Sequence, residues 1–407
     1  MTDHDKFFMG RKPAAVLKHH VLKEYFTVFA RMVGKGWSGH PIWLIDAYAG
    51  PGMYAAEEHA DEVPGSPVVA MGIAEQMRGK ADVRCAFIEQ NSRFAADLKR
   101  NIQPFVDAGL LGHVYPGEVA NELPKAWAMI GAEPVVTFLD PFGVAMPRAM
   151  MTSILLQRAK PPAEVMLNIS VAAVGRLGGN LELRDGQVVA KPGQEKGVKK
   201  ADEFLGGDWW RARFLDARVS DGSAARAAEA VVSQYCGQVE RETGTHSMSI
   251  PVRRRPDHPV LFYLTLFYRH EAAGYKFADA ASRATRKWRD AYREQELAED
   301  LAADAPTLFD AEPLVRVTRA KDAEEQEKTL QSEWIAQVAD NIRSGLAGRG
   351  SLALARDIRV ILGRTLSLAG ETEIRKAWDI LADEGTTVPR DKAQRSFWKQ
   401  TIIKRTK

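Results

Sequence analysis

The sequence contains very few residues that could crosslink the chain or bind a metal ion. Cys85 and Cys236 are the only cysteines among 407 residues. Two cysteines cannot supply a disulfide framework or a Cys-rich zinc site, and so low a number is typical of a reducing compartment. None of the nine histidines belongs to an H-x-x-x-H pair or a mixed His/Cys cluster. We therefore expect no metal site.

Long apolar runs and a strong net charge are also missing. The longest apolar run, Val260–Tyr268, has the length of a strand, well below the ~18 residues that a membrane helix needs. Met1–Lys12 is polar and charged, without the apolar core of a signal peptide. A formal charge of +3 is too small to indicate a class of partner. These features predict a cytoplasmic protein that does not contact the membrane.

Short apolar runs alternate with helical patterns over the first ~290 residues, which predicts a mainly parallel sheet with helices on both faces. The strand-like runs are Ile42–Ile45, Val83–Ile88, His113–Tyr115, Pro134–Leu139 and Glu164–Ile169. After the last of these, a stretch rich in glycine and charge predicts an irregular, mobile surface insertion.

Ser247–His270 follows as two apolar runs joined by a short basic turn, so its strands must be antiparallel neighbours. The arginines of that turn, Arg253–Arg255, either contact phosphates or simply keep the turn exposed to solvent. A parallel sheet that ends in one antiparallel hairpin is similar to that of class I methyltransferases. We predict this Rossmann-like α/β fold, with seven strands, for residues 1–292.

The composition changes after this domain. Residues 293–333 are acidic or highly charged without a continuous apolar face, which predicts a charged helical linker. In the remaining segment, 334–407, Ile374, Ala377, Trp378 and Leu381 repeat at helical spacing, and Gly385 follows as a stop.

The C-terminal end of the chain is strongly basic. Thr386–Lys407 contains seven basic residues and one acidic residue. Helix, turn, helix and basic hairpin together outline a winged helix, a unit that usually contacts phosphate backbones. The candidate nucleic-acid contacts are Arg390, Lys392, Arg395 and Lys399. A solvated basic tail on a small helical bundle is the alternative.

The segment "IDAYAGPGMY" places Asp46, Gly50 and Gly52 directly after the first strand. In an open parallel sheet, ligands bind at the carboxyl ends of the strands. Glycines let a backbone turn approach a ligand closely because they lack a Cβ. This D-x-x-x-G-x-G pattern therefore indicates a cofactor loop, although a plain turn between strand and helix has a similar pattern.

Two further carboxylates are expected at the same edge of the sheet. The second strand ends in Glu89, where a nucleoside cofactor needs an acceptor for its ribose hydroxyls. A solvated helix N-cap is the alternative for this residue. Glu118, after the third strand, either lies near an adenine amino group or begins a helix, where the helix dipole favours it.

The fourth strand ends in "FLDPFG", which is similar to the D/N-P-P-Y/F loop of amino methyltransferases. In that loop the acidic or amide side chain accepts a hydrogen bond from the target amine, and the aromatic ring stacks on a flipped base. We predict these roles for Asp140, Pro141 and Phe142. This sequence has one proline, with the aromatic residue in third place. A tight turn with Phe142 in the core is the alternative.

The ordered set "KHHVLKEYF", "IDAYAGPGMY", "PGSP", "AFIEQN", "FLDPFG" and "LFYLTLFYRH" resembles the three-Cys-motif partner (TcmP) family. The similarity covers roughly Lys12 to Trp288. It implies a fold closest to ribosomal-RNA adenine-N6 methyltransferases, whose "KH" helix also precedes the first strand. On that comparison Lys18 and His19 face the cofactor pocket, with His20 competing for the second role. It also implies a partner protein with three cysteines, which are not in this chain.

These patterns lead to one main hypothesis and two alternatives. The main one is an S-adenosylmethionine-dependent methyltransferase of an amino group, adenine N6 in DNA or RNA, working with the three-Cys-motif protein. The first alternative is a catalytically silent recognition or scaffold subunit for that partner. The second is a nucleic-acid-binding regulator that acts through the C-terminal unit alone.

Overall fold

A computed structural model describes residues 13–54, 63–303 and 312–405. The chain forms two compact units, Met1–Arg269 and His270–Lys407. Helix α11 (Glu271–Ala303) runs without a break through residue 292, where the sequence places the end of the first domain. The division into three segments stays a prediction. Among the described residues, no helix is both long enough and apolar enough to cross a bilayer.

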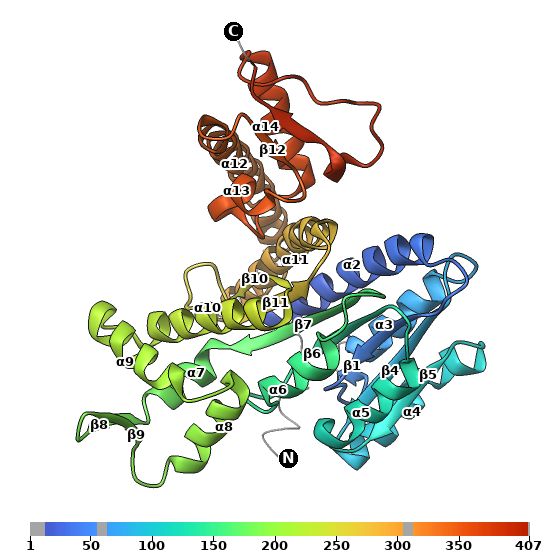
Figure 1. The fold of residues 1–407 in the computed structure, drawn as a ribbon. Coiled ribbons are helices and arrows are strands. Elements are labelled where there is room, and N and C mark those ends of the chain that lie inside the picture. Colours follow the sequence, from blue (N-terminus) through green and yellow to red (C-terminus); the bar gives the residue numbers. More distant parts are fainter. Residues whose placement is uncertain (1–12, 55–62, 304–311, 406–407) are drawn as a thin grey trace. The chain divides into compact units, whose positions relative to one another are not determined.

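The first unit is built on a seven-stranded sheet, in the order β10-β11-β7-β6-β1-β4-β5 (Figure 1). Its strands are β1 (Ile42–Asp46), β4 (Val83–Glu89), β5 (Gly112–Pro116), β6 (Val135–Leu139), β7 (Ala163–Ser170), β10 (His246–Val252) and β11 (Phe262–Tyr268). β11 is antiparallel to both of its neighbours, and every other neighbouring pair is parallel. This is the class I methyltransferase fold. The fold class and all five strand-like runs are confirmed.

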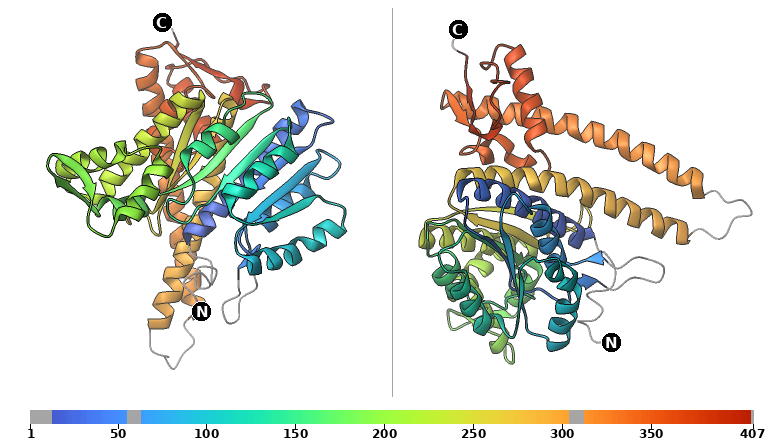
Figure 2. Two further views of the ribbon diagram at one scale, coloured as in Figure 1. Left: turned by 60° about the horizontal axis from the view of Figure 1, so that its bottom comes forward. Right: turned by 90° about the vertical axis from the view of Figure 1, so that its right-hand side faces the viewer.

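Helices cover both faces of this sheet, which explains why β1 and β6 are buried at every position. α2 (Pro13–Gly36), α3 (Ser66–Gln76) and α4 (Ser92–Asp107) pack on one face (Figure 2). The other face is covered by α5 (Val119–Ile130), by α10 (Ala224–Thr243), and by the short helix α6 (Arg148–Met150) with its π-helical continuation η1 (Met151–Leu155). A central strand buried on both faces needs apolar residues throughout, so its sequence shows no alternation.

The segment after β7 is regular, so the expectation of an irregular insertion is wrong. It contains α7 (Val171–Gly178), the hairpin β8 (Leu181–Arg184) and β9 (Gln187–Ala190), α8 (Glu195–Leu205) and α9 (Trp209–Asp221). Trp210, Phe214 and Phe204 are fully buried. Glycine-rich connections surround these helices, but the helices have apolar faces that fold against α10. A further two-stranded pair, β2 (Met53–Tyr54) and β3 (Val63–Pro64), follows β1.

The second unit begins with α11, which lies antiparallel to α12 (Glu312–Ala347) (Figure 2). The Arg289 guanidinium donates to both carboxylate oxygens of Glu327 at 2.6 and 2.8 Å and joins the two helices. The later elements are β12 (Ser351–Ala353), α13 (Ile358–Leu362), η2 (Gly363–Thr365), α14 (Glu371–Asp383), η3 (Phe397–Lys399) and β13 (Thr401–Ile403). α14 confirms the helix predicted before Gly385, where φ is +73°.

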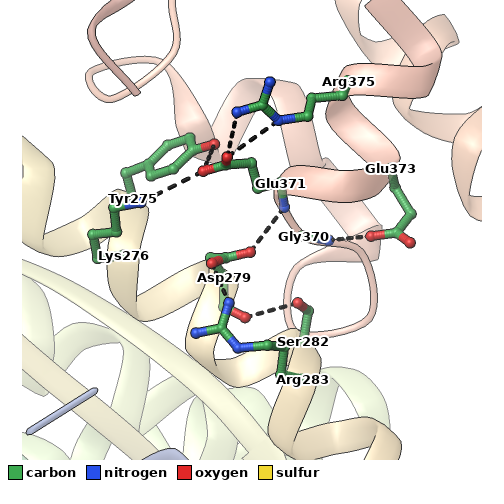
Figure 3. Close-up of polar contacts among 9 residues, drawn as sticks. All are labelled: Tyr275, Lys276, Asp279, Ser282, Arg283, Gly370, Glu371, Glu373 and Arg375. Atoms are coloured by element: carbon green, nitrogen blue, oxygen red, sulfur yellow. Dashed lines mark hydrogen bonds and ion pairs between the residues drawn. The ribbon is translucent and has the colours of Figure 1, made fainter. Parts of the chain in front are cut away.

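The start of α14 packs closely against α11 (Figure 3). The Asp279 carboxylate accepts a hydrogen bond from the Glu371 N–H at 2.9 Å, and the Tyr275 hydroxyl donates to the Glu371 carboxylate at 3.2 Å. A Cβ on Gly370 would overlap the Ser282 hydroxyl. The N-terminus of α14 is therefore already capped by a carboxylate of the same unit, which reduces its attraction for a phosphate.

Candidate cofactor and substrate site

Asp140 follows the last residue of β6 and is bound by side chains from two other elements. The Lys18 ammonium, on α2, forms an ion pair with its Oδ2. The Asn168 amide, on β7, donates a hydrogen bond of 2.6 Å to its Oδ1. The side chains of Lys18 and Asp140 are 7% and 20% exposed, so the pair is largely removed from water. Asp140 is thereby fixed at the carboxyl edge of the sheet.

The glycine turn after β1 lies against the end of β4. Gly50 and Gly52 have φ values of +65° and +84°, a region that side chains with a Cβ rarely enter. The Gly50 N–H donates to Glu89 Oε2 at 2.8 Å. A Cβ on Gly52 would lie only 3.0 Å from Leu98 on α4. The two glycines are thus needed for the shape of the turn and for its close packing.

Glu89 is a buried acceptor rather than a solvated helix cap, so the alternative for this residue is wrong. It is 8% exposed. Its second oxygen, Oε1, accepts from the Asn91 N–H at 2.7 Å. The N-cap of α4 is Asn91, whose side chain accepts from Arg93 and Phe94. Because each carboxylate oxygen has two lone pairs, Glu89 keeps acceptor capacity beyond these two bonds.

Asp46 is a buried carboxyl group between the glycine turn and Asp140. Burial raises its pKa to about 7, and the negative charge of Asp140 adds to the rise. The Ser66 hydroxyl, the Tyr48 N–H and the Lys18 ammonium oppose it. Oδ1 accepts from Tyr48 at 3.1 Å. Oδ2 is buried and has no hydrogen-bond partner of normal geometry in the described part of the chain.

The structure brings most of the sequence-predicted residues of the first unit to one edge of the sheet, at the ends of the adjacent strands β4, β1 and β6. Lys18 binds Asp140 rather than the glycine turn. His19 Nε2 lies 3.1 Å from the hydroxyl of Tyr54, at the end of that turn. Glu118 is exposed and stands at the N-cap position of α5, as the alternative for this residue expects, but its side chain makes no capping hydrogen bond. Its neighbour Gly117 donates to the Glu89 carbonyl at 2.9 Å.

The two residues after Asp140 differ in burial. Pro141 is buried, and Phe142 is 51% exposed. The alternative that placed Phe142 in the core is therefore wrong. A ring at the carboxyl edge with half of its surface exposed has room to stack on a planar ligand.

The candidate nucleic-acid contacts of the second unit separate into two kinds. Lys392, Arg395 and Lys399 are exposed. Arg390 donates two hydrogen bonds, of 2.8 and 2.9 Å, to the Asp379 carboxylate on α14, and its side chain is only 16% exposed. A bidentate pair of this kind occupies the guanidinium, so Arg390 contributes to the packing of its unit.

Sequence reasoning missed three residues that contact this site. Asn168 binds Asp140, Tyr54 contacts His19, and the Phe262 ring lies 5.7 Å from the Lys18 ammonium. Asn168 had a usable signal, because it is a polar residue near the carboxyl end of an apolar strand. Tyr54 and Phe262 resemble ordinary strand residues, and their positions follow only from the folded structure.

Neither a protein-family model nor a curated protein matches the chain. Among solved structures, the chain is similar to the O-methyltransferase TomG from Streptomyces achromogenes in complex with SAM, with 14% identity, 62% of this chain and 80% of that chain covered, and a TM-score of 0.33. YjhP from E. coli gives 12% identity, 61% and 97% coverage and a TM-score of 0.23. The cyclopropane synthase MmaA2 from Mycobacterium tuberculosis is 11% identical, with 72% of this chain and 77% of that chain covered and a TM-score of 0.24. The fold assignment rests on strand order and strand direction.

Proposed function

We propose that this chain is an S-adenosylmethionine-dependent methyltransferase that acts on an amino group, adenine N6 in nucleic acid. The observation that supports this best is the meeting of three features at neighbouring strand ends. Gly50 donates to Glu89 beside β1 and β4, and Asp140 lies one strand away at the end of β6. In open α/β sheets the carboxyl edge is where ligands bind.

The residues at this edge fit a cationic nucleoside cofactor. Glu89 retains lone pairs for the two ribose hydroxyls, and the glycine turn allows close approach of the backbone. The buried Oδ2 of Asp46 fits an ammonium group, which would satisfy this acceptor. When bound, the cofactor supplies a methyl group on a positively charged sulfur, which takes up the electron pair of the breaking carbon–sulfur bond.

Asp140 would orient the amine that accepts the methyl group. Lys18 and Asn168 use one lone pair on each carboxylate oxygen, which leaves acceptor capacity for an N–H of the target amine. Positioning the nitrogen in this way aims its lone pair at the methyl carbon. The exposed ring of Phe142 would stack on the base, and base–aromatic stacking contributes about 1–3 kcal/mol.

Cofactor binding provides the first test of this function. In calorimetric titrations with S-adenosylmethionine, we expect the Glu89→Ala variant to bind about 10- to 100-fold more weakly than the unmodified protein. The loss of one charged hydrogen bond to the ribose, worth roughly 1.5–3 kcal/mol, accounts for a change of this size. Glu75→Ala, which removes an exposed carboxylate on α3, is the matched control and should bind normally. No binding by the unmodified protein at millimolar ligand would refute the cofactor assignment.

A catalytically silent subunit for the three-Cys-motif protein is the second candidate. The observation that favours it is the occupation of both Asp140 oxygens by Lys18 and Asn168, together with the single proline after Asp140. This candidate requires that the protein bind S-adenosylmethionine and co-purify with the partner under anaerobic conditions without forming methylated product. Detection of methylated product by mass spectrometry would exclude it.

The second unit supports a nucleic-acid partner. Its element order, with β12 paired to β13 and Thr387 bridged to Lys404, supports the proposal of a winged helix, in which the segment 388–400 would be the wing. The N-terminus of α14 is capped by Asp279, and α14 carries both acidic and basic side chains. The segment 388–400 is therefore a better candidate than α14 for phosphate contact.

We expect the combined variant Lys392→Ala, Arg395→Ala and Lys399→Ala to bind duplex DNA or RNA about 10-fold or more weakly. The slope of log K against log salt should become shallower by about 0.9 per lost contact with duplex DNA. Arg390→Ala is a useful comparison, because it should lower the stability of the unit and leave the salt slope unchanged. An unaltered salt slope in the combined variant would rule out the wing as a phosphate contact.

A further inference from the structure

The turn between β10 and β11 lies at the same edge of the sheet as Asp140. β10 runs parallel to the central strands, so its last residue, Val252, ends at the carboxyl edge. Arg253, Arg254 and Arg255 follow immediately. The proposed function uses none of these three residues, although they place positive charge beside the candidate site.

Specific contacts connect this turn to Asp140. Phe262 begins β11 and pairs with Val252 on β10 and with Ser170 on β7. The Phe262 ring lies 5.7 Å from the Lys18 ammonium, which forms the ion pair with Asp140. From β6 the turn is three strand spacings away, about 14 Å at ~4.8 Å per spacing. Each nucleotide of one strand advances ~3.4 Å along the axis of a duplex, so this distance corresponds to roughly four nucleotides measured along that axis.

Backbone hydrogen bonds and prolines stabilise the conformation of this turn. The Leu261 N–H donates to the Val252 carbonyl at 2.9 Å, and the His258 N–H donates to the Arg255 carbonyl at 3.2 Å. Prolines precede and follow the arginines at residues 251, 256 and 259. Because proline fixes φ, it lowers the entropy lost on ordering the turn. The arginines are thus presented on a preorganised backbone.

The turn has a net positive charge even when its one acidic residue is included. Asp257 is the only acidic residue between Val252 and Leu261, against three arginines. Arg254 is exposed, whereas Arg253 and Arg255 are partly buried. A guanidinium offers a planar set of donors that matches a phosphate in a bidentate manner. Exposed arginine on a rigid turn suits a backbone phosphate, which requires position and charge but no base recognition.

We propose that the arginine turn, Arg253–Arg255, binds backbone phosphates of the nucleic-acid strand whose target base lies at Asp140. This inference rests on the proposed function and adds the residues that hold the substrate strand. Arg254 is the principal contact because it is exposed. The contact is independent of sequence and fixes the distance between the bound strand and the site, so it selects a polyanionic substrate over a free nucleoside.

The test compares charge reversals on opposite edges of the same sheet in the full-length protein. Binding of a fluorescent single-stranded oligonucleotide is measured as a function of salt for the unmodified protein, Arg254→Glu, Arg254→Lys and Lys80→Glu. Lys80 is exposed after α3, at the amino edge of the sheet, and provides the matched control. S-adenosylmethionine affinity is measured in parallel by calorimetry.

We expect Arg254→Glu to weaken oligonucleotide binding about 10-fold at ~100 mM salt and to make the salt slope shallower by about 0.7 or more. Arg254→Lys keeps the charge but not the bidentate donors, so it should restore the salt slope and only part of the affinity. Lys80→Glu should change the affinity less than twofold. Equal effects of Arg254→Glu and Lys80→Glu would overturn the proposal. So would equally strong, Arg254-dependent binding of polyglutamate, because the turn would then recognise acidic protein.

The same experiment separates this inference from the proposed function. If the unmodified protein binds S-adenosylmethionine but no oligonucleotide, the nucleic-acid substrate and the arginine turn fail together while the cofactor assignment stands. If it binds both and Arg254→Glu has no effect, the arginine turn alone is wrong. Normal cofactor affinity in Arg254→Glu confirms that the variant is folded.

Discussion

The Asp140→Ala variant is expected to lower kcat for methyl transfer by about 10³-fold, with S-adenosylmethionine affinity within about threefold of the unmodified protein. A side chain that is positioned to accept a proton of the reacting group typically contributes 10²- to 10⁴-fold to the rate, and we expect the Asp140 carboxylate, as the acceptor of the amine N–H, to fall in this range. Glu89 and the glycine turn, where we propose that the cofactor binds, do not hydrogen-bond to Asp140. Single-turnover methylation of a nucleic-acid substrate, together with calorimetric titration, measures both quantities.

Loss of the carboxylate also leaves the buried Lys18 ammonium without its ion-pair partner. An unpaired charge that is largely removed from water lowers the stability of the folded protein. Two control variants address this. Asp140→Asn keeps an acceptor for Lys18 and for the target amine, so it should retain activity within about 10-fold. The double variant Asp140→Ala with Lys18→Met removes the stranded charge and should be as inactive as the single variant. Full activity in a folded Asp140→Ala protein would show that the carboxylate has no role.

The Glu164→Gln variant should be more stable than the unmodified protein at pH 8, by about 3 kcal/mol, and equally stable near pH 4.5. Glu164 on β7 is buried and accepts a hydrogen bond of 2.6 Å from the Tyr25 hydroxyl on α2. Burial raises its pKa from 4.5 to about 7, against the lowering effect of that bond. Each unit of pKa shift corresponds to about 1.4 kcal/mol.

The direction of this change in stability with pH follows from the number of protons bound by the folded and unfolded states. Between pH 4.5 and 7 the folded protein retains the Glu164 proton and the unfolded chain releases it, so stability falls as the pH rises through this range. Glutamine cannot ionise and still accepts the Tyr25 hydroxyl. Urea denaturation at pH 4.5, 6 and 8 measures the difference, and Glu75→Gln on the surface is the control. A constant difference at all three pH values would show that Glu164 does not titrate in this range.

The sequence was sufficient to predict the main sheet because its central strands are buried on both faces. Runs such as Val135–Leu139 have no polar residue that faces solvent, and glycine or a carboxylate marks their ends. The same marks located the glycine turn, Glu89 and Asp140. These features are local, so a pattern of a few residues is enough to find them.

The contacts that the sequence did not reveal depend on residues far apart in the chain. Lys18 and Asp140 are separated by 122 residues, and only the packing of α2 beside the end of β6 brings them together. Arg390 was expected to face a ligand, but Asp379 on the preceding helix binds it. Basic composition predicts the sign of the charge on a surface, whereas the folded structure decides which of those charges are neutralised by other residues of the protein.

Gly370 lies at a crowded junction of α11 and α14, where a methyl group would overlap two side chains of α11. A side chain there would displace Ser282 or Asp279, and the second of these caps α14. α14 leads directly through Thr387 into the segment 388–400, whose exposed cations include Lys392 and Arg395. A single small substitution at a position with no charge and no ligand would therefore disturb the helix that leads into a basic surface more than twenty residues further along the chain.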